Sequence, residues 1–142
     1  MTDSNLGVLD ASVAVKCFLD EEGSPAARRA VAERAGWIAP DLIFLEVASV
    51  ALKSIRRGLL DRTQGARMVA GVGVLLIDAV PASELCDAAF RLAADHGFSA
   101  YDAAYLALAK QQGSQLLTAD IKLANLAKAA GLGEFVTALA SA

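Results

Sequence analysis

The carboxylates are the side chains of this sequence that are best placed to do chemistry. Asp10 directly follows the first short apolar run, and Asp120 follows another such run near the end of the chain. Asp102 stands near the start of an alanine-rich stretch, and Glu46 lies inside a helical pattern. Four acids placed in this way can bind a metal ion together, or each can serve the local structure alone.

Capping of a helix N-terminus is the structural alternative for three of the four acids. Asp10 or Ser12 can cap the helix that follows the first run. Asp102 follows Ser99 at the spacing of a capping box, with Asp in place of the usual Glu. Asp120 joins a strand end to a helix start, where it or its neighbour Thr118 can be an N-cap. The residues alone leave capping and catalysis both open at these positions.

Glu46 has no such explanation because it falls in the middle of a predicted helix. Its neighbours three and four positions away include the apolar Leu42, Ile43 and Val50. An ionised carboxylate on an apolar stripe costs several kcal/mol if it is buried without a partner. Lys53 is two turns away, too far for a direct helical pair, so a partner from elsewhere is needed. A metal ion would serve.

The expected fold gathers these acids. In a parallel α/β sheet the carboxyl ends of the strands form one edge, and ligands bind in the crevice there. Crowded carboxylates raise one another's pKa unless a cation neutralises them. Hard oxygen ligands without His or Cys suit Mg²⁺ or Mn²⁺, which can lower the pKa of a bound water and hold phosphate oxygens. The pattern therefore indicates phosphodiester hydrolysis.

Short strands that alternate with longer helices must position the acids. The apolar patterns predict strands over 6–9, 37–39, 74–80, 115–118 and 134–137, the last at a sheet edge. Capping residues, prolines and glycines predict helices over 12–19, 24–34, 40–57, 62–70, 81–96, 100–112 and 120–130. With no repeat or linker, this alternation predicts one α/β domain over residues 1–142, a parallel sheet covered on both faces.

Composition excludes several other classes of protein. The chain has 142 residues, 56% of them hydrophobic, and a net charge of −3, as expected for a single domain. The longest apolar run, 68–77, is far shorter than the roughly 20 residues of a membrane-spanning helix. The N-terminus does not resemble a secretory signal, so we expect a cytoplasmic protein. Cys17 and Cys86 are expected to be reduced core thiols, and the single histidine, His96, excludes a His-rich zinc site.

Five segments together resemble the PIN-domain ribonucleases, specifically the VapC-type toxins of bacterial toxin–antitoxin pairs. In order along the chain they read VLDASVAVK, APDL, LEVASVAL, HGFSAYDAAYLALA and LLTADIKL, and they begin at 8, 39, 45, 96 and 116. Each segment alone is a weak signal. Their order and spacing, from about Val8 to Val136, make the resemblance specific.

The resemblance implies a three-layer α/β/α sandwich with an acidic pocket for Mg²⁺ or Mn²⁺. Asp10 and Asp102 fall on the positions of the principal metal ligands. Glu46 and Asp120 fall on the acids that shape the pocket, bind the metal and help to orient the attacking water. The residues that match supporting, hydrogen-bonding positions are Ser12 and Thr118. No motif departs from the family pattern, so the pocket is expected to be active.

The resemblance also implies partners. VapC-type toxins cut RNA, usually form homodimers, and are inhibited by a small VapB-like antitoxin whose tail lies in a groove over the early helices, often with an arginine at the acids. One stretch of the chain has a local charge of +4 and can guide RNA phosphates; its basic residues are Lys53, Arg56, Arg57, Arg62 and Arg67. The alternative for this stretch is a solvated helix pair.

Two other functions compete with a ribonuclease. The first is a catalytically silent PIN-like binding module, although loss of activity would usually show as a missing acid. The second is a receiver-like phospho-acceptor switch with Asp78 as acceptor, but receivers place two acids after the first strand, where Asp10 is followed by Ala-Ser.

Several other residues have simpler explanations. Trp37, Tyr101 and Tyr105 are expected to pack against the rest of the protein, and His96 to end a helix. Lys16 either faces the pocket or lies on the surface.

Overall fold

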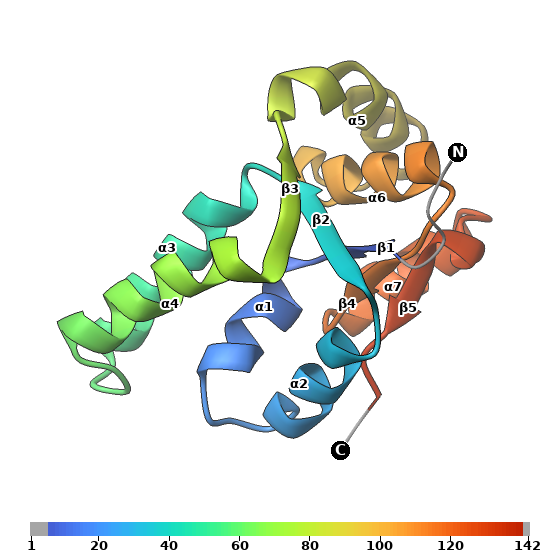
Figure 1. Ribbon diagram of the computed structural model, residues 1–142. Coiled ribbons are helices and arrows are strands. Elements are labelled where there is room, and N and C mark those ends of the chain that lie inside the picture. Colours follow the sequence, from blue (N-terminus) through green and yellow to red (C-terminus); the bar gives the residue numbers. More distant parts are fainter. Residues whose placement is uncertain (1–5, 141–142) are drawn as a thin grey trace.

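The computed structural model describes residues 6–140 and contains one sheet of five parallel strands. The strands are β1 (Leu6–Leu9), β2 (Gly36–Pro40), β3 (Leu76–Val80), β4 (Leu116–Thr118) and β5 (Val136–Ala138). Their order across the sheet is β3-β2-β1-β4-β5. The predicted parallel α/β sheet is therefore confirmed (Figure 1).

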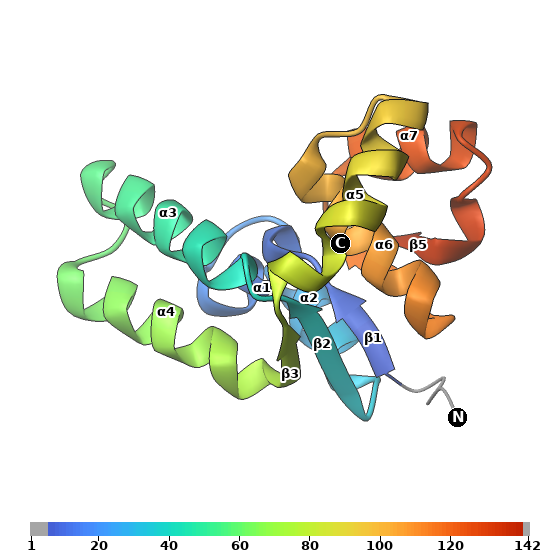
Figure 2. The same ribbon diagram turned by 90° about the horizontal axis from the view of Figure 1, so that it is seen from above.

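Helices cover both faces of the sheet. They are α1 (Ala11–Phe18), α2 (Ser24–Ala32), α3 (Ile43–Arg56), α4 (Arg62–Leu75), α5 (Ala82–His96), α6 (Ala100–Gln112) and α7 (Ile121–Ala129). Parallel strands are joined by right-handed crossovers, so the direction in which the chain moves across the sheet decides the face. The connections β1–β2–β3 and β3–β4–β5 move in opposite directions. Accordingly α1 packs with α2, α3 and α4, whereas α6 packs on β1, β2 and β4 with α5 against it (Figures 1 and 2).

The strand order changes direction between the central strand β1 and its neighbour β4. At such a switch point the outgoing connections leave toward opposite faces, and a crevice opens at the carboxyl ends of the strands. Asp10 follows β1 and Asp120 lies two residues after β4. The fold thus brings residues from the two ends of the chain to this crevice.

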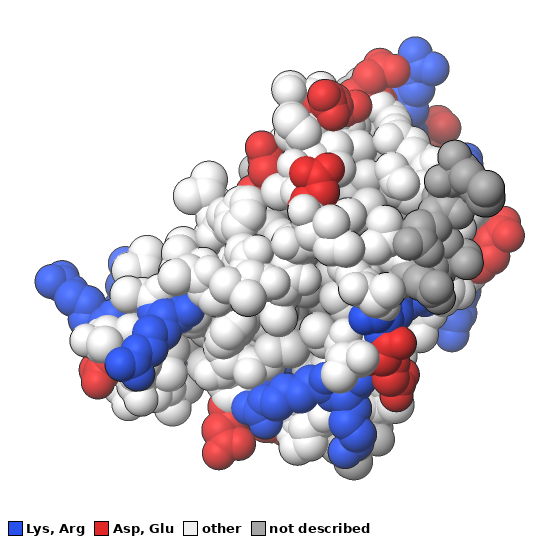
Figure 3. Space-filling model, in the orientation of Figure 1, with Lys and Arg blue, Asp and Glu red and all other residues white. Residues whose placement is uncertain are grey.

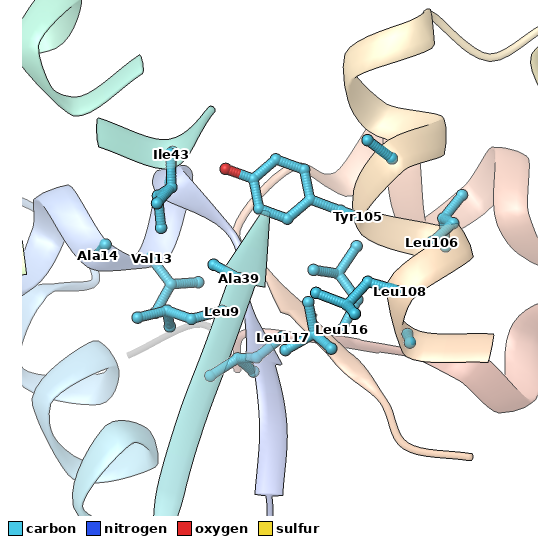
Figure 4. Close-up of a cluster of buried hydrophobic side chains, with 14 of the residues drawn as sticks. Leu9, Val13, Ala14, Ala39, Ile43, Tyr105, Leu106, Leu108, Leu116 and Leu117 are labelled. Atoms are coloured by element: carbon cyan, nitrogen blue, oxygen red, sulfur yellow. The ribbon is translucent and has the colours of Figure 1, made fainter. Parts of the chain in front are cut away.

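The core lies between the central strands and α6. Every residue from Ala103 to Ala109 is buried, because α6 is enclosed between the sheet and α5. Figure 4 shows Leu108 of this helix beside Leu116 of β4. Trp37 is also buried, as predicted, and its indole N–H donates to the carbonyl of Val31 at 2.9 Å. The Trp37 ring lies so close to Gly7 that a Cβ there would overlap it.

The second half of the α3–α4 hairpin differs from the prediction. Residues 74 and 75 end α4, whereas the sequence predicts a strand from 74 onwards. An apolar β-branched run fits a helix or a strand equally well. Residues 74 and 75 are helical because they continue α4, which a capping box at Asp61 and Gln64 starts and which buries Met68 and Val72 at helical spacing. The shorter β3 is an edge strand with exposed Asp78.

Three smaller expectations also changed. The segment Gly133–Phe135 is a turn of 3-10 helix, so the last strand begins at Val136 rather than at 134. Cys86 is exposed on the outer helix α5 and is not a core thiol, whereas Cys17 is half-buried. Tyr101 is exposed rather than packed. Within residues 6–140, none of the helices has the length and apolar character needed to cross a bilayer.

Candidate active site

All four candidate acids line one open cavity of about 330 Å³. They arrive from different parts of the fold: Asp10 between β1 and α1, Glu46 from the first turn of α3, Asp102 from the first turn of α6, and Asp120 at the start of α7. The cavity is completed by Ala11, Ser12, Ser49, Val50 and Lys53. The expected meeting of the acids at the carboxyl edge of the sheet is therefore what the structure contains.

Asp10 is held from behind by two hydroxyl groups. Its side chain is 7% exposed, and its Oδ2 accepts hydrogen bonds from Ser12 Oγ at 2.5 Å and from Thr118 Oγ1 at 2.8 Å. Although Asp10 occupies the N-cap position of α1, its side chain makes no capping hydrogen bond. The alternative that Asp10 is a helix cap is therefore wrong.

The two supporting hydroxyls are themselves fixed by the loop after β4. Ser12 Oγ accepts from the backbone N–H of Ala119 at 2.9 Å, and Thr118 Oγ1 accepts from that of Asp120 at 3.0 Å. Each hydroxyl thus donates its single proton to the Asp10 carboxylate and accepts one hydrogen bond from the backbone. The predicted supporting role of Ser12 and Thr118 toward the acids has a direct structural counterpart.

Of the other two junction acids, Asp120 both caps a helix and lines the cavity, whereas Asp102 lines the cavity without capping a helix. Asp120 Oδ1 accepts from the backbone N–H of Leu123 at 3.1 Å and caps α7. Ser99, not Asp102, caps α6, accepting the Asp102 backbone N–H at 3.1 Å. The capping alternative is correct for Asp120, but it does not exclude a second role because both side chains face the same cavity.

Glu46 has a partner that the sequence did not identify. Its Oε1 accepts a hydrogen bond of 2.7 Å from the hydroxyl of Tyr105 on α6. The carboxylate is half-buried at the cavity, so it is neither a surface group nor fully enclosed. Tyr105 is buried as predicted, yet its hydroxyl reaches the site as well. The available signal was the position of Tyr105 three residues after Asp102, on the same face of the helix.

The acids raise one another's pKa. Burial is the main cause of the raised pKa of Asp10, and the charge of Asp120 adds to it against the opposing hydrogen bonds. Burial also raises the pKa of Glu46 and of Asp102, and for both the charge of Asp10 raises it further. Three carboxyl groups in one cavity are therefore harder to ionise than in water.

The donor set fits a hard divalent cation. Within residues 6–140 no three His, Cys, Asp or Glu side chains already form a group that could hold a metal ion. The four acids instead surround a shared cavity and repel one another across it, and every side-chain ligand they offer is oxygen. A cation at this place would relieve that repulsion, and oxygen ligands suit Mg²⁺ or Mn²⁺.

The basic residues divide between the cavity and the surface. Lys53 lines the acidic cavity, although the sequence placed it too far from Glu46 for a helical pair. Arg56, Arg57, Arg62 and Arg67 are exposed on the α3–α4 hairpin and the turn within it. Figure 3 shows blue side chains at the far end of this hairpin. Lys16 lies outside the acidic cavity, where its Nζ pairs with Glu21 at 3.2 Å, which confirms the surface alternative.

A second cavity adjoins the first. It has a volume of about 670 Å³ between α1, α3 and the start of α4, and it shares Val50 and Lys53 with the acidic cavity. Its lining mixes apolar residues, among them Phe18, Leu19 and Leu60, with an equal number of polar and charged ones. A molecule that occupied this cavity would lie next to the four acids.

Sequence reasoning also missed a cap on the outer helix of the α5–α6 pair. The N-cap position of α5 is Pro81, whose side chain has no acceptor. Asp41, which follows β2, supplies the missing group: its Oδ1 accepts the backbone N–H of Ala82 at 2.9 Å. This contact ties the start of α5 to the chain segment that leads into α3.

Comparisons with known proteins agree on one family. The sequence model of the PIN domain matches residues 7–129. Ribonuclease VapC3 of Pyrobaculum aerophilum is 38% identical over 119 residues, which cover 82% of this chain and 91% of that protein. VapC ribonuclease Mb0985 of Mycobacterium bovis is 31% identical over 122 residues, which cover 86% and 91%. The crystal structure of PAE2754 from Pyrobaculum aerophilum has the same fold, with a TM-score of 0.64 at 22% identity over 86% of this chain and 80% of that one.

Proposed function

Since this chain belongs to the PIN-domain family, and within it to the VapC-type proteins, we propose that it is an endoribonuclease that requires Mg²⁺ or Mn²⁺. The relatives named above carry the word ribonuclease in their names. The observation that supports the same activity here is the convergence of four carboxylates on one cavity at the switch point of the sheet. The proposal covers the whole chain as one PIN domain.

The geometry suggests how the acids divide the work. Asp10 and Asp102 would hold the cation, with the Asp10 carboxylate fixed by the two hydroxyls that donate to its Oδ2. Glu46 and Asp120 would complete the metal site and orient the attacking water, with Glu46 Oε2 left unused by Tyr105. When bound, Mg²⁺ or Mn²⁺ supplies the positive charge that lowers the pKa of a water and holds the phosphate oxygens.

The alternatives are less consistent with this site. A silent binding module would not need four acids around a cavity of mainly polar lining, all of them intact. A receiver-like switch needs its acceptor at the acidic crevice, but Asp78 is exposed in the middle of an edge strand and is absent from the residues that line the cavity.

The RNA substrate would approach along the α3–α4 hairpin. This hairpin carries the local positive charge, and Lys53 extends it to the rim of the acidic cavity. Phosphate contacts dominate the affinity of proteins for nucleic acids, so a basic path beside an acidic centre can hold RNA despite the net charge of −3. The proposed place of this activity is the cytoplasm.

A toxin–antitoxin role completes the proposal. A small VapB-like antitoxin would place its tail in the cavity between α1, α3 and α4, which shares Val50 and Lys53 with the acidic cavity. An arginine at the end of such a tail could pair with them. The active unit would be a homodimer, as is usual for VapC-type toxins.

Cleavage of RNA by the purified chain tests the activity. Total RNA is incubated with the wild type in Mg²⁺, Mn²⁺ or EDTA, beside Asp10→Asn and Asp102→Asn. We expect cleavage that depends on the metal and is lost in both variants. Cleavage that persists in EDTA or in either variant would refute the proposed mechanism.

Growth of cells tests the toxin role. Expression of the chain alone is expected to arrest growth, and co-expression of any short reading frame that overlaps the start of its gene is expected to restore it. Normal growth with the active chain alone would argue against a toxin.

A further inference from the structure

We infer that Tyr105 is a positioning residue that holds the Glu46 carboxylate in the orientation the reaction needs. The inference rests on the proposed function, because Glu46 matters only if the acidic cavity binds a metal ion and cleaves RNA. It assigns a task to a hydroxyl that core packing does not require.

Helix α6 brings two functional groups to the cavity from one face. Asp102 and Tyr105 are three residues apart, so they are neighbours on the helix surface. Asp102 lines the cavity directly, whereas Tyr105 reaches across the core to α3. In Figure 4 the Tyr105 ring extends from α6 with its oxygen directed toward the side on which Ile43 of α3 lies. One helix thus supplies an acid and the donor that fixes another acid.

The Tyr105 hydroxyl is a rigid donor. The side chain is only 1% exposed and its ring is enclosed by the core, so the oxygen has little freedom to move. Glutamate has a long side chain, and ordering it removes a large amount of rotamer freedom. A 2.7 Å hydrogen bond from a fixed phenol to Oε1 removes much of that freedom before any ligand binds. Oε2 is then presented to the cavity in one orientation.

The same device appears at Asp10. There, Ser12 and Thr118 both donate to the same carboxylate oxygen, Oδ2, and so fix the orientation of the group. At Glu46, Tyr105 does this alone. Hydroxyl donors behind metal-binding carboxylates are a known way to orient ligands, and their loss typically costs 10–100-fold in metal affinity or activity.

The hydrogen bond requires the hydroxyl group and not the ring of Tyr105. A phenylalanine would fill the same space without donating to Glu46.

The chain offers a matched control for the test. Tyr101 lies one turn earlier on α6 and is 67% exposed. Tyr105→Phe and Tyr101→Phe therefore make the same chemical change in the same helix, and only one of them touches Glu46. Both are compared with the wild type and with Glu46→Ala.

Binding of Mn²⁺ to the purified chain, measured calorimetrically without RNA, is the first readout. Tyr105→Phe is expected to weaken binding about 10–100-fold and to lower kcat for RNA cleavage, and Tyr101→Phe to change neither. In the Glu46→Ala background, Tyr105→Phe is expected to have less than a twofold further effect, because the acceptor is already gone. An equal loss in both backgrounds would show a merely structural role and overturn the inference.

A second measurement does not depend on how well the variants fold. The Tyr105 hydroxyl proton is buried and hydrogen-bonded, so it should exchange slowly with water and be visible by proton NMR in the wild type. Titration with Mg²⁺ is expected to shift this resonance. No shift at saturating Mg²⁺ would overturn the inference while leaving the ribonuclease proposal standing. A wild type that binds neither metal ion would overturn both.

Discussion

The substitution Asp10→Asn is expected to stabilise the metal-free protein while it abolishes RNA cleavage. Asp10 is nearly enclosed, and one of its oxygens accepts from both Ser12 and Thr118. An asparagine amide oxygen can accept both hydrogen bonds in the same place, and its NH₂ group can donate to the nearby acids. The substitution therefore removes a charge and changes little else.

The sign of the effect follows from the raised pKa of Asp10. Burial and the charge of Asp120 raise this pKa in the folded protein above its ordinary value of 3.8. The folded state therefore holds the proton more tightly than the unfolded state. Stability is greatest below the unfolded pKa and is lost as the pH rises through the folded pKa. Asparagine is neutral at every pH, like the protonated acid, so the variant does not lose this stability as the pH rises.

The size of the effect can be estimated from the cost of an uncompensated buried group. Each unit by which a pKa is raised corresponds to about 1.4 kcal/mol at a pH above both values. Relief of a buried, repelled charge is worth about 1–3 kcal/mol. With an unfolding entropy of about 0.3 kcal/mol/K for a chain of 142 residues, the Tm should rise by about 3–10 °C.

Thermal melting in EDTA between pH 4 and pH 8 measures this gain. The difference in Tm between Asp10→Asn and the wild type is expected to widen as the pH rises, and Mn²⁺ is expected to raise the Tm of the wild type more than that of the variant. Asp78→Asn is the control, because this acid is exposed on the edge strand. It is expected to change the free energy of unfolding by less than about 0.5 kcal/mol. Two results would refute the reasoning: a Tm of the variant at pH 8 that is no higher than that of the wild type, or a gain in Tm at pH 4 that equals the gain at pH 8.

Three further predictions concern contacts away from Asp10. Asp41→Ala should destabilise the chain by about 0.5–2 kcal/mol, because the start of α5 loses its cap; chemical denaturation checks this, and Asp41→Asn losing as much would argue against capping as the cause. Gly7→Ala should cost about 1–3 kcal/mol, because the new methyl group would overlap the buried ring of Trp37; an unchanged Tm would contradict the packing of β1 described above. Lys53→Gln should raise the KM for RNA and reduce the slope of log KM against log salt by about 1, whereas the same change at Arg91 on α5 should not; equal slopes in both variants would exclude Lys53 from the RNA path.

The junctions between strands and helices could be predicted because their signals are local. The helix 100–112 was predicted with the bounds of α6, since Ser99 caps one end and Gly113 ends the other. Asp10 and Asp120 were placed correctly at the carboxyl ends of two strands. A parallel sheet brings such ends together whatever the details of packing, so the acidic cavity followed from the topology.

Contacts between distant segments could not be predicted in this way. The hydroxyl that reaches Glu46 comes from a residue 59 positions later, and the Asp41 cap acts on a helix 41 positions away. No local pattern marks either pair, because both depend on how α3, α5 and α6 pack in three dimensions. The prediction of where α4 ends was wrong for a different reason. A short apolar run is compatible with both a helix and a strand until its neighbours in the fold are known.

The chemical identity of the cleaved ends tests the central claim most directly. The purified chain is incubated with a labelled RNA in Mn²⁺ and water enriched in ¹⁸O, and the new termini are analysed by mass spectrometry. If the acids hold a cation that activates water, each new terminal phosphate should carry one ¹⁸O atom, a 2′-O-methyl group at the cleaved position should not prevent the reaction, and Asp10→Asn should give no product. Products that end in 2′,3′-cyclic phosphate and form equally well in EDTA would contradict the account.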